Sequence, residues 1–296
     1  MRAYKRLLLV ANPAMHHGLA IQRSAEIAKA SGAALHLAVF EQIPSLLPFL
    51  AKETQDSANL CHLDAVEGWL HNEAQLLRAR GLEVSTEVAW SEAVVQTILD
   101  HVEQSDADLL IKDIHHEPVL KRTFITPLDW HLLRQCPVPV HLIGPAGNAV
   151  PQVIIAAVDA ASPDALRNGL NGRIIEAAQR LAEYSEAQLH LVHALDLTSV
   201  YFGDATGSTL AWADLWAHVQ LEVEKTFHDL ADRYRIPSGH CHLSVGAPVQ
   251  VLAELSEQLD ADVLVMGRVH RCGLNKLVGS TTEHLLYRSS RSILAV

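Results

Sequence analysis

The chain has 296 residues and a net charge of −11, a length typical of two ordinary domains that each bury a core. It has no lysine- or arginine-rich run to displace phosphate counterions, which argues against nucleic-acid binding. No apolar stretch approaches the roughly 20 residues that span a bilayer, and the first residues lead into an apolar run rather than a signal peptide, which predicts a cytoplasmic protein. We expect reduced thiols, because paired spacing is absent among Cys61, Cys136, Cys241 and Cys272.

One sequence pattern occurs twice along the chain, and five segments match in the same order. The clearest match sets residues 106–111 (DADLLI) against residues 260–265 (DADVLV). The other matching pairs are 7–12 with 153–159, 35–37 with 189–191, 87–90 with 242–245, and 129–133 with 282–286. The repeat predicts two domains, residues 1–146 and 147–296.

Short apolar runs alternate with longer stretches of helical period in each half, which predicts an α/β fold with a parallel sheet covered on both faces. Apolar residues three and four apart indicate helices over residues 174–181 and 213–234, and Pro248 suits the first turn of another helix. The expected strands of the second half are 152–158, 188–194, 240–245, 262–267 and 291–296. The sequence therefore predicts two tandem doubly wound, five-stranded parallel-sheet domains.

The last segments of the two halves, residues 138–142 and 292–296, are expected to be edge strands. Exposed edges favour pairing, so the halves could join as an intramolecular pseudo-dimer. A further homodimer through the apolar helical faces, and an unknown protein partner, stay open at this point.

Ligands of doubly wound sheets bind outside the carboxyl ends of the strands, where the strand order reverses. Asp159 follows the first strand of the second half, where a carboxylate can accept hydrogen bonds from a ribose hydroxyl or help to hold a cation. Residues 267–282 follow the fourth strand and combine glycines, three cationic side chains and a helix-opening Gly-Ser-Thr-Thr stretch, all suited to an anion. In the alternative interpretation, the glycines serve a turn and a helix cap, and the cations are solvated.

The loop from Gly267 to Gly279-Ser280, downstream of Asp159, resembles the G-x2-G-x9-G-[ST] signature of the universal stress protein family. The repeat resembles the tandem class of that family, and residues 124–137 resemble its E-type subgroup. The resemblance implies an adenine-nucleotide-hydrolase-like fold, dimerisation through the last strand, bound ATP with magnesium in some members, and a role in surviving DNA damage or starvation. The nucleotide-binding residues that it implies are Asp159, Ala194, Gly267, His270, Gly279, Ser280 and Thr281.

This chain departs from the signature in both halves. His270 replaces the second glycine, so an imidazole stands where the backbone would approach phosphates. The interval from His270 to Gly279 is also one residue shorter than in the signature. A protonated His270 could instead cap an anion. In the first half the ligand motif is lost. Asn12, Asp113 and His116 stand in place of Asp159, Gly267 and His270, and Thr126-Pro127 replaces Gly279-Ser280. We predict that the first half binds no nucleotide, because Asp113 would repel phosphate and Pro127 removes an amide donor.

Three functions follow: a non-enzymatic stress-response protein whose second domain binds an adenine nucleotide, a degenerate scaffold without nucleotide, or a binder of an apolar ligand between the lobes near Trp212 and Trp216. No G-x-S-x-G elbow is present, so any hydrolysis of a bound nucleotide would be slow and incidental. A zinc site at His240 and His242 lacks a second pair of ligands at a recognisable spacing, and surface or packing histidines are the preferred interpretation.

Overall fold

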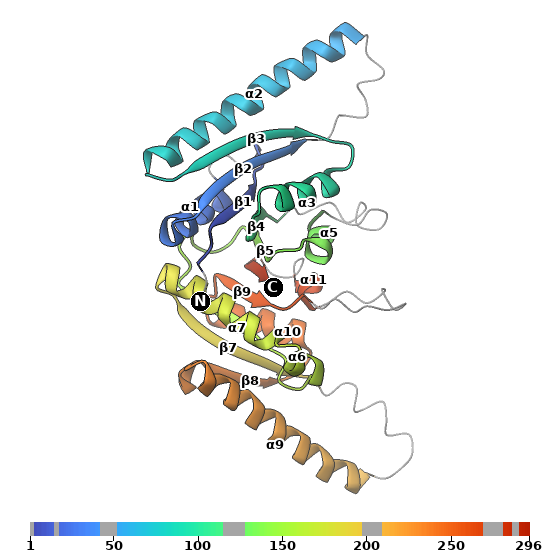
Figure 1. Ribbon diagram of the computed structural model, residues 1–296. Helices are drawn as coiled ribbons and strands as arrows, with labels where there is room; N and C mark the ends of the chain where they lie inside the picture. Colours follow the sequence, from blue (N-terminus) through green and yellow to red (C-terminus); the bar gives the residue numbers. More distant parts are fainter. Residues whose placement is uncertain are drawn as a thin grey trace. The chain divides into compact units, whose positions relative to one another are not determined.

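The computed structural model of the protein describes residues 3–14, 18–41, 52–114, 128–196, 209–268, 281–285 and 290–296. The chain divides into two compact units, Arg2–Pro145 and Ala146–Val296. Each unit is an α/β domain built on a parallel five-stranded sheet (Figure 1). The predicted fold class of the two halves is therefore confirmed.

The first unit has the strand order β3-β2-β1-β4-β5. Its strands are β1 (Arg6–Val10), β2 (Ala34–Glu41), β3 (Val84–Trp90), β4 (Leu109–Asp113) and β5 (Val140–Ile143). Its helices are α1 (Leu19–Ser31), α2 (Lys52–Ala79), α3 (Val94–Gln104) and α5 (Leu128–Gln135). Leu7–Val10 of β1 and Leu109–Ile111 of β4 are buried apolar runs, because both faces of a central parallel strand are covered by helices.

The second unit repeats this arrangement with the strand order β10-β9-β6-β7-β8. Its strands are β6 (Val153–Ala157), β7 (Gln188–Leu195), β8 (Cys241–Val245), β9 (Val263–Met266) and β10 (Ser292–Ala295). Its helices are α6 (Pro163–Arg167), α7 (Leu170–Ser185), α9 (Thr209–Arg233), α10 (Pro248–Gln258) and α11 (Thr281–Leu285). The five strands and the helices predicted for this half are found within a few residues of their expected bounds.

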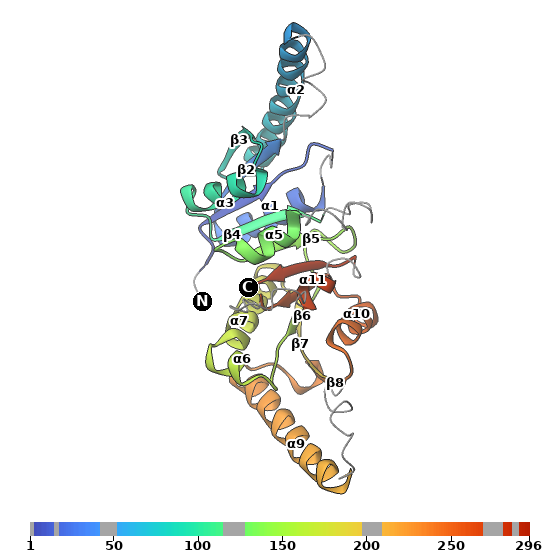
Figure 2. The ribbon, with the colours of Figure 1, turned by 90° about the vertical axis from the view of Figure 1, so that its right-hand side faces the viewer.

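The helices cover both faces of the second sheet, as the view in Figure 2 shows for α7 and α10. α7 buries one stripe that includes Ile174, Ile175, Ala178 and Leu181, whose spacing of three and four residues indicated a helix in the sequence. α10 begins at Pro248, which fits the first helical turn because the amide that proline lacks has no partner there. β5 and β10, the last strands of their units along the chain, each stand at one end of the strand order of their unit, and the pairing between them stays a prediction.

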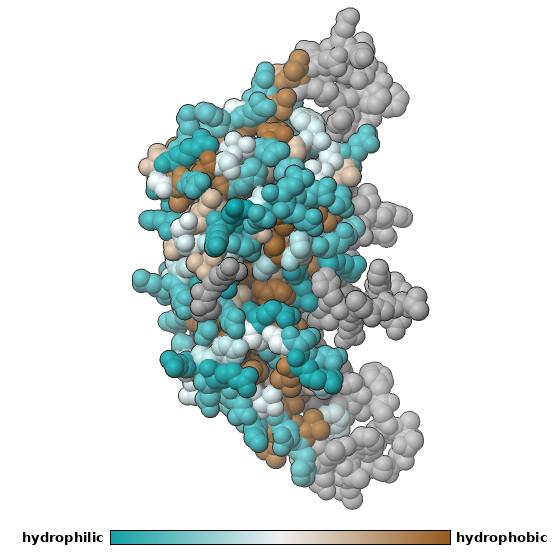
Figure 3. Space-filling model, in the orientation of Figure 1, coloured by the Kyte–Doolittle hydropathy of each residue, from teal (hydrophilic) through white to brown (hydrophobic). Residues whose placement is uncertain are grey.

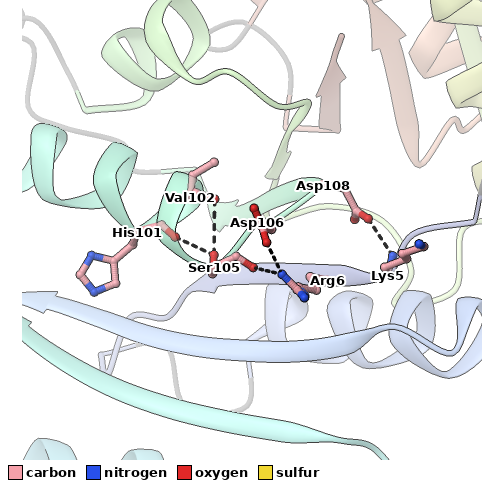
Figure 4. Close-up of polar contacts among 7 residues, drawn as sticks. All are labelled: Lys5, Arg6, His101, Val102, Ser105, Asp106 and Asp108. Carbon is pink, nitrogen blue, oxygen red and sulfur yellow. Dashed lines mark hydrogen bonds and ion pairs between the residues drawn. The ribbon is translucent and has the colours of Figure 1, made fainter.

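The repeated Asp-Ala-Asp segment is a turn at the amino end of the sheet. In the first unit it leads from α3 to β4, and Asp106 adopts a left-handed backbone conformation with φ of 47°. The Asp106 carboxylate accepts a hydrogen bond from Arg6 Nη1 at 2.6 Å, and the Asp108 carboxylate accepts one from the Lys5 amide at 2.7 Å (Figure 4). The turn thereby ties the start of β1 to the start of β4.

The second unit builds the same turn between α10 and β9. Asp260 has φ of 50° and pairs with Arg291 at 2.8 Å. Asp262 is almost fully buried and accepts hydrogen bonds from the amides of Asn148, Gln152 and Val153 at 2.8, 2.6 and 3.2 Å. The most similar segment of the two halves is thus a structural turn at the end of the sheet opposite to the carboxyl ends of the strands.

No helix within the described part of the chain is both long enough and apolar enough to cross a membrane.

Candidate functional site

The strand order of the second unit reverses between β6 and β9. The chain passes from β6 to β7 and β8 on one side and then returns to β9 on the other side of β6. Asp159 follows β6 and Gly267 follows β9, so the structure places both residues at the carboxyl ends of adjacent strands. A doubly wound sheet binds its ligand at this point.

Asp159 begins an exposed turn that leads into α6. One carboxylate oxygen, Oδ1, accepts hydrogen bonds from the amides of Ala161 and Ser162 at 3.1 and 3.0 Å. Ser162 in turn caps α6 by accepting a hydrogen bond from the Ala165 amide at 3.3 Å. The second oxygen, Oδ2, has no hydrogen-bond partner among the residues that the structure describes.

Two buried side chains hold the backbone of this turn. The Asn171 carboxamide accepts a hydrogen bond from the Asp159 amide at 2.9 Å and donates one to the Asp159 carbonyl at 2.8 Å. His193, in β7, places Nδ1 at 3.1 Å from the Val158 carbonyl oxygen and 3.4 Å from the Ala160 amide nitrogen. Burial lowers the pKa of His193, so the ring is neutral at neutral pH.

Gly267 lies against the start of α7. A β-carbon added to Gly267 would come within 2.8 Å of the Leu170 Cδ2 atom, so the residue has a packing reason to be glycine. The Gly267 carbonyl also accepts a hydrogen bond from the Thr282 hydroxyl at 3.2 Å. These contacts connect the end of β9 both to the helix that carries Asn171 and to the start of α11.

The remaining predicted site residues are only partly placed. Ala194 lies in β7 near its carboxyl end and is half-buried, and Thr281 begins α11 and is half-buried. His270, Gly279 and Ser280 fall outside the described residues, so the phosphate loop implied by the resemblance stays a prediction.

The corresponding end of the first unit carries charged side chains of its own. Lys112 Nζ lies 2.8 Å from the Asp129 Oδ1 atom, and both side chains are at least 98% buried. Lys112 also donates a hydrogen bond to the Asp113 carbonyl at 2.7 Å. Burial raises the pKa of the Asp113 carboxyl, while Lys112 and a backbone hydrogen bond from Ala20 oppose this shift. Asp113 stands at the position of Gly267, and the buried Lys112–Asp129 ion pair lies next to it in the first unit.

Asn12 makes the same local turn as its counterpart Asp159. Its Oδ1 atom accepts a hydrogen bond from the Ala14 amide at 3.0 Å. The two halves therefore share the turn and differ in the charge at its first residue. His116, Thr126 and Pro127 fall outside the described residues, and the lack of nucleotide binding in the first half stays a prediction.

The histidines considered for zinc pack on one another. His190 Nδ1 lies 3.0 Å from His242 Nε2, and the His190 ring stacks on the His240 ring with centroids 4.4 Å apart. Burial and the two neighbouring histidines lower the pKa of His190 to about 4. Among the described residues no group of three or more histidine, cysteine or acidic side chains could hold a metal ion. The three rings pack on one another, and the preference for packing histidines over a zinc site stays a prediction.

The structure describes the side chain of only one of the two tryptophans of the predicted apolar-ligand site, Trp216. Trp216 is half-buried, its indole nitrogen is buried, and that nitrogen has no partner among the described residues. The side chain of Trp212 lies outside the described set. The exposed large apolar residues of the described chain include Val219 and Leu221 on α9, and the surface in Figure 3 shows apolar residues in small groups among hydrophilic ones.

Sequence reasoning missed the supporting residues of the site. Neither Asn171 nor His193 was predicted as a site residue, although a histidine near the carboxyl end of an apolar strand is a signal for a local role. Lys112 was also missed. Its signal in the sequence is a lysine that directly follows the apolar residues Leu109–Ile111 of a predicted buried strand. A buried cation in a central strand requires a buried anion nearby.

Several known proteins are similar to this chain over its full length. The model of the universal stress protein family matches residues 3–144 and 152–296. Universal stress protein E of Escherichia coli K12 is 24% identical over 299 residues, covering 97% of this chain and 92% of that protein. The universal stress protein E homolog of Haemophilus influenzae is 25% identical over 319 residues, covering 99% and 97%.

A crystal structure of a functionally unknown protein from Pseudomonas aeruginosa PAO1 has a TM-score of 0.74 and 28% sequence identity to this chain. The alignment covers 100% of this chain and 93% of that one. Together with the family match over both units, this likeness over the full chain agrees with the two-unit α/β fold described above. The chain belongs to the universal stress protein family, as a tandem two-domain member that is similar over its full length to universal stress protein E.

Proposed function

We propose that the second unit binds an adenine nucleotide, with magnesium, at the carboxyl ends of β6, β7 and β9. The observation that carries this proposal is the Asp159 turn. It lies at the reversal of strand order, its backbone is held by buried side chains, and its carboxylate keeps one oxygen without a partner among the described residues. Such an oxygen suits a ribose hydroxyl or a cation that accompanies phosphates.

The protein acts in this proposal as a non-enzymatic stress-response protein that senses the nucleotide. Support comes from the likeness to proteins named universal stress protein E, and survival of DNA damage or starvation is the corresponding role. Deleting the gene and restoring it with wild-type or Asp159→Asn chains would test that role through survival counts. Equal survival of the deleted and the restored strains would contradict it.

Calorimetric titration with ATP and magnesium tests the binding proposal, after a denatured sample has been checked for co-purified nucleotide. We expect one site per chain. Asp159→Asn keeps the oxygen that forms the turn, as Asn12 does in the first unit, but removes the charge. Losing a hydrogen bond to a charged group should weaken binding by about 10- to 150-fold.

Asn12→Ala is the matched control, because it alters the corresponding turn in the unit that is expected to bind no nucleotide. It should leave the affinity unchanged. Equal losses in the two variants would contradict a site at Asp159.

The second candidate function is a scaffold without nucleotide, and the contact between Gly267 and Leu170 favours it. If Gly267 is glycine because α7 packs there, the residue needs no ligand to explain it. A titration without heat, together with no retained nucleotide, would favour the scaffold. Protein partners that stay bound after the loop from Gly267 to Ser280 is replaced would then be expected.

A further inference from the structure

The turn at Asp159 has two layers of support that differ in how they are built. The first layer is local: Asp159 Oδ1 accepts two amide hydrogen bonds, and the Val158 amide donates to the Val192 carbonyl at 2.9 Å. The second layer consists of Asn171 and His193, which come from α7 and β7 and contact three consecutive residues of the turn. Both of these side chains are at least 97% buried.

The first unit has the local layer without the histidine. Asn12 accepts the equivalent turn hydrogen bond, and the Ala11 amide donates to the Ala38 carbonyl at 2.8 Å, as Val158 does to Val192. The match of residues 35–37 with 189–191 places Val39 at the position of His193, and Val39 is buried. The turn therefore forms without an imidazole, and the second unit carries the imidazole for another reason.

The His193 ring has one favourable tautomer. Its Nε2 atom is buried and has no hydrogen-bond partner among the described residues. A proton on Nε2 would be a buried donor without an acceptor, which is rarer in proteins than an acceptor without a donor. We assign the proton to Nδ1, which donates it to the Val158 carbonyl at 3.1 Å, so the longer approach of the Ala160 amide to Nδ1, 3.4 Å, is a packing contact in this tautomer. The ring thus fixes the last carbonyl before Asp159, while Asn171 fixes the amide and carbonyl of Asp159 itself.

We propose that His193 and Asn171 are positioning residues for the nucleotide site, which fix the backbone at Asp159 so that its free carboxylate oxygen faces the ligand. This inference rests on the proposed function. It assigns to the second unit a rigid, preorganised turn in which less backbone freedom is lost when a nucleotide binds. The first unit keeps a turn of the same type without the histidine.

The test combines two measurements on the full chain: amide hydrogen exchange of peptides covering residues 159–162, and calorimetric affinity for ATP with magnesium. His193→Val introduces the residue of the first unit, and Asn171→Leu removes the carboxamide at similar volume. Each variant should speed exchange in this segment and weaken binding, by about 10-fold for the loss of a positioning hydrogen bond. His193→Asn retains a donor near the position of Nδ1 and should recover part of both losses.

Val192→Ala is the matched control. Val192 is fully buried in the same strand, next to His193, and β-strand alternation points its side chain to the opposite face. The substitution keeps the Val192 backbone carbonyl that accepts the hydrogen bond from the Val158 amide. It should lower the melting temperature without changing exchange at 159–162 or the affinity. An equal loss of affinity in Val192→Ala would show that the effects follow stability and would overturn the positioning role.

The two readouts separate this inference from the proposed function. Unchanged exchange at 159–162 in His193→Val and Asn171→Leu would overturn the positioning role, whether or not nucleotide binds. If the wild-type chain binds no nucleotide while both variants speed exchange, the proposed function fails and the hold of the two side chains on the turn is supported.

Discussion

Replacing Lys112 by methionine should destabilise the first unit strongly. The substitution keeps the length of the aliphatic chain but leaves Asp129 with a fully buried carboxylate whose ammonium partner, 2.8 Å away, is gone. Removing one partner of a buried ion pair typically costs about 3–5 kcal/mol, because the remaining charge is uncompensated. The Asp113 carbonyl also loses the hydrogen bond from Lys112.

Hydrogen exchange on the full chain measures this loss unit by unit. Since about 1.4 kcal/mol corresponds to a factor of ten, protection of β4 amides should fall by about two to nearly four orders of magnitude. Amides of β9 in the second unit serve as the internal reference and should change little. The double variant Lys112→Met/Asp129→Leu should recover most of the protection, because it removes both charges. Unchanged β4 protection in Lys112→Met would refute the reasoning.

Three further outcomes are expected. Asp262→Ala leaves three backbone amides without their acceptor, whereas Asp108→Ala leaves one. Chemical denaturation should therefore show a larger loss in the free energy of unfolding for Asp262→Ala. A larger loss for Asp108→Ala would contradict the stabilising role of the Asp262 hydrogen bonds. Because the pKa of His190 is lowered from 6.5 to about 4 in the folded state, the unfolded state binds more protons between these values, so stability should be fully present above pH 6.5 and fall as the pH drops toward 4; His190→Phe should flatten this dependence in thermal melts. Gly267→Ala should cost about 1–3 kcal/mol through its clash with Leu170 and much less in a Leu170→Ala background, a coupling that a double-mutant cycle measures and that additive losses would disprove.

The strands and most helices were predictable because their signals are local. A parallel central strand is apolar along its length, and β6 and β9 therefore stand out in the sequence. The position of Asp159 at the reversal of strand order was also predictable, since the repeat determines which strands correspond and the fold class determines where ligands bind.

The supporting contacts were not predictable, because they join residues that are distant in sequence. Nothing in the local pattern shows that Asn171 accepts a hydrogen bond from the Asp159 amide, or that the buried Lys112 forms an ion pair with Asp129 of α5. The explanation for Gly267 changed as well. A backbone approach to phosphate and a close approach to Leu170 both require a missing side chain, and only coordinates reveal the second.

The duplicated Asp-Ala-Asp turn has a practical consequence for engineering this chain. Its contacts connect strand starts, whereas Asp159, Gly267 and Lys112 lie at strand ends. In each unit, the residues that connect the strands and the residues of the candidate ligand site therefore lie at opposite ends of the sheet. The two ends can therefore be changed separately. Replacing the segments that follow the strands of one half by those of the other half should give a folded chimera that has the ligand preference of the donor half.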